Sequence, residues 1–86
     1  MNFEYNTSGT CSKKIDIELS DDGVIKAVKF IGGCHGNLQG ISALVVGMKA
    51  EDVIARIGGI RCGFKSTSCP DQLSKALKQA IAANKA

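Results

Sequence analysis

The hydrophobic period of this 86-residue chain changes once, between Gly32 and Gly36, and the change divides the chain into two parts. From Lys14 to Ser20, apolar and charged residues alternate, which is the pattern of a strand with one solvated face. After Gly36, apolar residues recur every three or four positions, as they do along one face of a helix. Strands first and helices after predict an α+β two-layer sandwich, with the helices on one face of an antiparallel sheet of two or three strands.

A hairpin is predicted in the first part. The dipeptide Asp22-Gly23 is a turn signal, and the stretch from Val24 to Ile31 that follows it is rich in β-branched residues. Phe3 and Tyr5 lie in a shorter alternating stretch, which we expect to add a third strand at the edge of the sheet. An exposed edge strand can pair with a second copy of the chain, so a homodimer is one expectation.

Three helices are predicted in the second part. The first begins near Asn37, and the second runs from about Ala50 to Ile57 and ends at the glycine pair that follows. The third begins at Pro70, because proline is favoured at the first helical position. Since the residue before a proline is disfavoured in the helical conformation, we expect Cys69 to be the N-cap of this helix.

Length and composition narrow the class of protein. The chain has no repeat, linker or low-complexity segment, so residues 1–86 are expected to form a single domain. The N-terminal residues lack the features of a secretion signal, and no apolar run approaches the ~20 residues that span a bilayer, so we expect a cytoplasmic protein with no membrane partner. Eleven Lys and Arg against eight Asp and Glu give a net charge of +3 without a basic cluster, so nucleic-acid binding is not expected.

Four cysteines give the strongest indication of function: Cys11, Cys34, Cys62 and Cys69. In a reducing compartment, cysteines indicate metal or redox chemistry instead of disulfides. The predicted hairpin brings the start of one strand beside the end of the next, so Cys11 and Cys34 are expected to be neighbours on one rim of the sheet. With Cys62 and Cys69, the four thiolates would complete the tetrahedral set that suits zinc or an iron–sulfur cluster.

The spacing of these cysteines matches no zinc-finger template and contains no Cys-x-x-Cys pair, so only the tertiary structure can assemble them. A plain alternative is that they are four small core residues. Glycine or small polar residues flank every cysteine, which favours a metal site, because glycine allows close backbone approach and hydroxyls donate to thiolate sulfur. His35, Ser68 and Asp71 are candidates for hydrogen bonding to the ligands, and His35 is alternatively a ligand or an exposed loop residue. No catalytic residue is predicted.

The segment Thr67-Ser68-Cys69-Pro70-Asp71 resembles the signature of the TSCPD domain family. Similarity in residues 32–37 and 59–63 extends the resemblance over nearly the whole chain. It implies a module that occurs alone or near the C-terminus of adenosylcobalamin-dependent ribonucleotide reductases, where a cysteine-rich tail is associated with zinc binding. A reductase needs a large barrel and nucleotide sites that 86 residues cannot form, so the resemblance implies an accessory of nucleotide metabolism and DNA replication.

The order of elements is also similar to the NifU/IscU-type iron–sulfur scaffold family. On that likeness, Cys11, Cys34 and Cys69 match three cluster ligands. Two departures are that Lys13 stands where the scaffold has an acidic residue, and that Ser68 stands where one branch has histidine. The added Cys62 would close the coordination shell, which favours a retained structural metal over a cluster built for transfer.

Three functions remain open from the sequence. The first is a four-cysteine zinc module that is accessory to ribonucleoside-diphosphate reductase-type nucleotide reduction, and removal of its metal is expected to unfold the domain. The second is an iron–sulfur cluster scaffold or carrier, whose partner would belong to an iron–sulfur pathway. The third is a thiol–disulfide electron shuttle for a reductase partner, acting through a reactive Cys69 thiolate.

Overall fold

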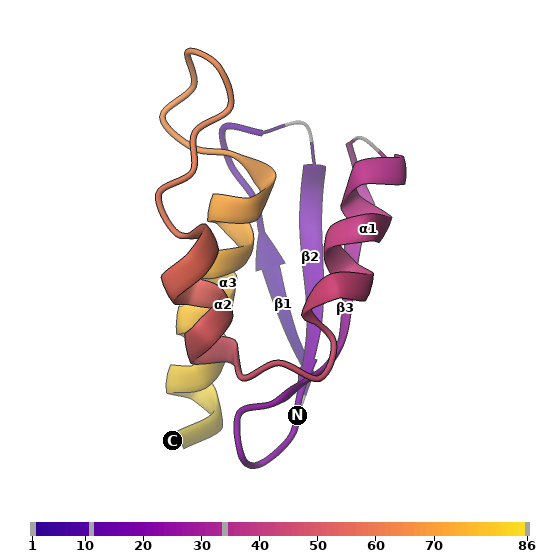
Figure 1. The fold of residues 1–86 in the computed structure, drawn as a ribbon, viewed down its shortest axis with the longest axis vertical. Coiled ribbons are helices and arrows are strands. Elements are labelled where there is room, and N and C mark those ends of the chain that lie inside the picture. The colour runs from indigo at the N-terminus through magenta and orange to yellow at the C-terminus, as the bar shows by residue number, and fades with distance from the viewer. Residues whose placement is uncertain (1, 11, 34, 86) are drawn as a thin grey trace.

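The computed structural model of the protein describes residues 2–10, 12–33 and 35–85. Three strands are followed by three helices, so the predicted α+β order is confirmed (Figure 1). The strands are β1 (Asn2–Asn6), β2 (Ser12–Leu19) and β3 (Ile25–Gly32), and the helices are α1 (His35–Val45), α2 (Ala50–Ile57) and α3 (Cys69–Lys85).

The sheet is antiparallel, and β2 lies in its middle with β1 and β3 at the edges. Ile15 pairs with Tyr5 on one side and with Phe30 on the other. The edge strand expected from Phe3 and Tyr5 is therefore present. The predicted turn at Asp22-Gly23 joins β2 to β3, and Gly23 adopts φ 81°, a left-handed conformation that glycine takes without steric cost.

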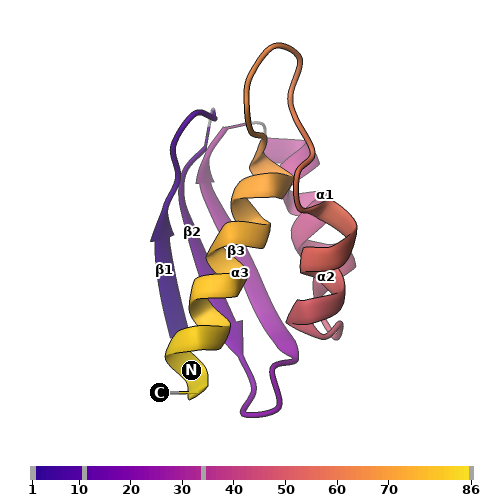
Figure 2. The ribbon, with the colours of Figure 1, turned by 90° about the vertical axis from the view of Figure 1, so that its left-hand side faces the viewer.

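The helices cover one face of the sheet, and Figure 2 shows α3 crossing in front of it. Ile15, Ile17 and Leu19 are buried on this face because their alternation directs all three to the same side. The buried residues of α3 are Leu73, Ala76, Leu77 and Ala80, spaced three or four apart. Burying each large side chain stabilises the fold by about 1.5–3 kcal/mol.

The opposite face of the sheet is solvated and charged. Lys14 Nζ lies 3.5 Å from Glu4 Oε1 and 3.7 Å from Asp16 Oδ1. Ion pairs with this exposure are worth about 0–1 kcal/mol each. The hydrophobic core therefore lies between the sheet and the helices, and the molecule has the two layers that the sequence predicted.

The helix boundaries agree with the sequence in part. α2 spans the predicted residues, Ala50–Ile57, and its C-cap is Gly58, whose N–H bonds to the carbonyl of Ile54. α1 begins at His35, two residues before the expected Asn37. Among the described residues, no helix is long and apolar enough to cross a membrane.

The expected N-cap of α3 is wrong by one residue. α3 begins at Cys69, and Ser68 is its N-cap: the Ser68 carbonyl accepts the Gln72 N–H at 2.8 Å. The Ser68 hydroxyl accepts the Asp71 N–H at 3.1 Å. A serine hydroxyl is among the best acceptors at an N-cap, and this outweighs the bias against helical conformation in the residue before Pro70.

Candidate thiol site

One end of the molecule gathers several chain segments. The loop of residues 58–68 projects beyond the sheet at this end before it leads into α3 (Figures 1 and 2). Ser12, the first residue of β2, pairs here with Gly32, the last residue of β3. The loop, the start of α3 and two strand ends therefore meet at one place.

Ser12 and Cys69 make the contact that joins the sheet to α3. Their side-chain oxygen and sulfur atoms lie 3.4 Å apart, within hydrogen-bonding distance for sulfur. Thr10 Oγ1 lies 3.1 Å from Ser12 Oγ, so two hydroxyls and a thiol form a chain. Cys69 is also the first residue of α3, where backbone N–H groups and the helix dipole favour negative charge. A thiolate at Cys69 is therefore stabilised from two directions.

Cys62 lies close to the same place. A hollow of about 30 Å³ is lined by Cys62 and Cys69 together with Thr10, Lys65 and Ser68. A volume of that size holds about one water molecule or ion. Cys62 is exposed, and its position is set by a tight turn: its N–H donates to the Thr67 carbonyl at 3.1 Å, and its carbonyl accepts the Lys65 N–H at 3.0 Å. Two cysteines and a lysine therefore border one small space.

The segment Thr67-Ser68-Cys69-Pro70-Asp71, called the motif below, holds the loop onto α3. The Asp71 side chain is buried, and its Oδ1 accepts the Gly59 N–H at 2.6 Å while its Oδ2 accepts the Thr67 hydroxyl. Lys75, one helical turn later, lies 3.4 Å from Oδ2. The hydrogen bond from Thr67, then that from Gly59, lowers the pKa of Asp71 below its usual 3.8, although burial opposes the shift. Asp71 is therefore a carboxylate at neutral pH, and it anchors both ends of the loop.

Two further buried side chains complete this network. The Ser68 hydroxyl donates to the Ile60 carbonyl at 2.6 Å. Gln72 Nε2 donates to Thr67 Oγ1 at 3.0 Å, and Gln72 Oε1 accepts the N–H of Ser8, in the β1–β2 connection, at 3.0 Å. The motif thus ties the loop, the start of α3 and the β1–β2 connection together.

The structure describes some of the site residues that the sequence predicted and not others. Ser68 lines the hollow with the two thiols, whereas the Asp71 carboxylate binds Gly59 and Thr67 of the loop. The Ser68 hydroxyl bonds to the Ile60 carbonyl and to the Asp71 N–H of α3. Their expected role toward the metal ligands stays a prediction. Cys11, Cys34 and the side chain of His35 lie outside what the structure describes, so the expected pairing of Cys11 with Cys34 also stays a prediction.

Sequence reasoning did not single out Ser12 or Gln72. Ser12 carried a weak signal, since it is one of the small polar residues that flank the cysteines. Gln72 carried none, because its partner Ser8 is 64 positions away. Within residues 2–10, 12–33 and 35–85, no three His, Cys, Asp or Glu side chains gather closely enough to hold a metal ion.

The fold and the site define a small α+β domain whose thiols lie where a capped helix meets the end of a three-stranded sheet. The family model of the TSCPD domain matches residues 3–81, so the chain belongs to the TSCPD domain family. No curated protein and no solved structure matches the chain. The similarity to the NifU/IscU-type scaffold family is not supported by these comparisons.

Proposed function

We propose that this TSCPD domain binds one zinc ion through Cys11, Cys34, Cys62 and Cys69. The observation that carries the proposal is the 3.4 Å contact between Ser12 and Cys69, because it brings the chain that directly follows Cys11 against the helix-opening thiol. Cys62 shares the hollow beside Cys69.

The surroundings of the two described thiols fit a thiolate-bound metal. Zinc in structural sites prefers four sulfur or nitrogen ligands, and a hydroxyl that donates to a coordinating sulfur stabilises its charge. Ser12 offers that hydroxyl to Cys69, and Lys65 is one of the residues that line the hollow. Ser12 pairs with Gly32, two residues before Cys34 in the sequence. This pairing supports a contribution of Cys34 from the same end of the sheet. Zinc there would supply structural cross-linking of the loop, α3 and the strand ends.

The biological role that we propose is that of a protein accessory to ribonucleoside-diphosphate reductase-type nucleotide reduction. Membership of the TSCPD domain family supports this role. The partner would be a reductase protein, and the domain would act by binding and not by catalysis of its own.

Metal analysis of the untagged protein, purified without oxygen, tests the zinc site. We expect close to one zinc per chain, no visible absorbance, and loss of zinc in the Cys62→Ser and Cys69→Ser variants. The Ser66→Ala variant, in the same loop but outside the hollow, is the control and should retain zinc. Iron with sulfide and visible absorbance would show an iron–sulfur cluster in place of zinc. Protein without any metal would refute both the zinc site and the iron–sulfur cluster.

Thiol–disulfide exchange is the second candidate, and the hollow shared by Cys62 and Cys69 favours it. The Cys69 thiolate would attack a disulfide of the partner, and Cys62 would then displace the partner's sulfur. Two electrons pass to the partner's two thiols, and a Cys62–Cys69 disulfide forms. Metal-free protein treated with a small disulfide should then lose two hydrogens, with the new bond mapped to these two residues. Failure of this bond to form would eliminate the candidate.

A further inference from the structure

β3 is an edge strand with an outer side that carries no strand. The N–H and carbonyl of Ile25 bond to Met48 and Gly47, and from Lys26 to Gly32 no other described segment pairs with that side. Along an edge strand, alternate residues direct backbone N–H and carbonyl groups outward. Such a row is a template for an extended segment of another chain, which can add as one more strand.

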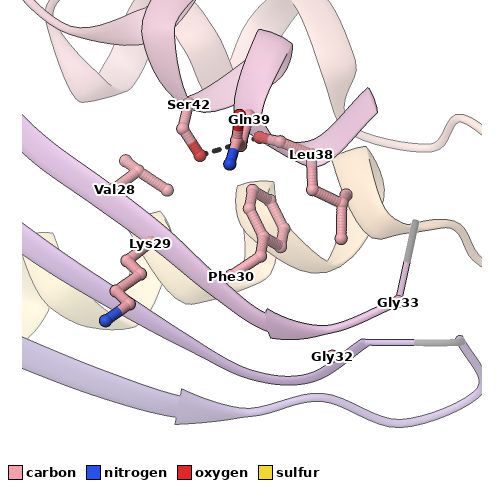
Figure 3. A pocket seen from close by; sticks show the side chains of 8 residues that line it. All are labelled: Val28, Lys29, Phe30, Gly32, Gly33, Leu38, Gln39 and Ser42. Atoms are coloured by element: carbon pink, nitrogen blue, oxygen red, sulfur yellow. Dashed lines mark hydrogen bonds between the residues drawn. The ribbon is translucent and has the colours of Figure 1, made fainter. Parts of the chain in front are cut away.

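A groove runs beside this strand. It lies between β3 and α1 and has a volume of about 270 Å³ (Figure 3). Val28 and Phe30 point from β3 toward α1, and Leu38 of α1 adds a third apolar side chain. Gln39 and Ser42 of α1 also line the groove and supply polar groups. Val28 and Leu38 are buried, with 8% and 5% of their surface exposed, whereas Phe30 is partly exposed. Phe30 is therefore the main apolar contact that the groove offers to the helix-covered side of an added strand.

The charge along β3 selects among possible partners. Lys26 and Lys29 are exposed, and Figure 3 shows Lys29 pointing to the side away from α1. Pairing of β3 with β3 of a second copy would bring lysines together, and like charges on neighbouring strands oppose pairing. Lys29 lies opposite Asp16 of β2, so one carboxylate already neighbours it within the sheet. An acidic strand added on the outer side of β3 would place a second carboxylate beside Lys29.

We propose that β3 accepts an extended acidic segment of a partner protein as a fourth strand. Side chains alternate across a strand, so every second side chain of the segment enters the groove beside Phe30. The intervening acidic side chains face the side of the sheet that carries Lys29. The groove shares no lining residue with the thiol hollow, although Gly32 and Gly33 at its end directly precede Cys34.

Nuclear magnetic resonance of the full chain tests the proposal with a short synthetic peptide that alternates glutamate and valine. We expect saturable shifts of the amide signals of β3 and of Gln39 and Ser42, with a Kd below about 1 mM. A peptide with lysine in place of glutamate should not bind. A glutamate peptide methylated on alternate backbone nitrogens should also fail, because it cannot donate hydrogen bonds to β3.

Charge removal supplies the matched variants. Lys29→Gln should weaken binding of the glutamate peptide at least about fivefold, because it removes the charge that the acidic side chains meet. Lys78→Gln removes the same charge from an exposed position of α3 and should leave binding unchanged. Shifts confined to β1 or to residues 58–68, equal binding of the lysine peptide, self-association through β3, or no saturable shift would each overturn the proposal.

Discussion

Ser12 Oγ lies 3.4 Å from Cys69 Sγ, although 57 positions separate the two residues in the chain. The contact joins the first residue of the central strand to the first residue of the last helix. Ser12 is buried and Cys69 is partly buried, so the contact is shielded from bulk water and its strength is less reduced by solvent than that of a surface bond.

Replacing Ser12 by alanine should weaken zinc binding. The variant removes the hydroxyl that faces Cys69 Sγ, and loss of a hydrogen bond to a metal ligand lowers affinity about 10- to 100-fold. Competition with a chromophoric chelator measures the change. Ser8→Ala is the control, because the Ser8 side chain is exposed and only its backbone bonds to Gln72. Equal zinc affinities of the Ser12→Ala and Ser8→Ala variants would show that the Ser12 hydroxyl does not support zinc binding.

Replacing Asp71 by asparagine should destabilise the domain by about 1.5–3 kcal/mol at neutral pH, because a charged hydrogen-bond acceptor is lost. The pKa of Asp71 is lowered by folding, so its contribution is complete above the usual value of 3.8 and falls as the pH drops through the lower folded-state pKa. The difference in the free energy of unfolding between the wild type and the Asp71→Asn variant should therefore become smaller in strong acid. Urea titrations at several pH values measure it, and Asp21→Asn in the exposed turn should show no such difference.

Two glycine replacements should act with opposite sign. A Cβ at Gly58 would lie 2.8 Å from the Ile54 carbonyl oxygen, so Gly58→Ala should cost about 1–3 kcal/mol. A Cβ at Gly40, inside α1, meets nothing within 4 Å, so Gly40→Ala should stabilise the protein by about 0.5–1 kcal/mol. Thermal melts measure the change in stability of each variant relative to the wild type. A stabilised Gly58→Ala or a destabilised Gly40→Ala would contradict the packing described here.

Replacing leucine by alanine should destabilise the protein much more at a buried position than at an exposed one. Leu77 is fully buried between α3 and the sheet, and Leu77→Ala should cost about 2–5 kcal/mol through the cavity that it leaves. Leu44 is 77% exposed, and Leu44→Ala should change stability by no more than about 0.5 kcal/mol. Chemical denaturation measures both values. Similar losses in the two variants would argue against the layer arrangement.

The local elements were predictable because their signals are local. The alternation of Ile15, Ile17 and Leu19 identified the strand and its buried face, and Asp22-Gly23 identified the turn. The second helix was predicted within its observed bounds, Ala50–Ile57, because its apolar spacing and the glycine pair that ends it lie within a few residues. The N-cap of α3 was missed because Ser68 and Pro70 give conflicting local signals, and the Asp71 N–H that bonds to the Ser68 hydroxyl decided between them.

The sequence by itself determined the order of strands and helices, the family to which the chain belongs and the identity of the cysteines, since these depend on neighbours in the chain. Only the tertiary structure decided that Ser12 faces Cys69, that Cys62 shares its hollow and that Gln72 reaches Ser8. For Ser12 and Gln72 the physical reason is distance along the chain, and for Cys62 it is the turn that bonds its N–H to the Thr67 carbonyl just before α3. Hydrogen bonds between residues about 60 positions apart follow from the packing of α3 on the sheet, which a periodic pattern indicates as a buried face but does not place in register.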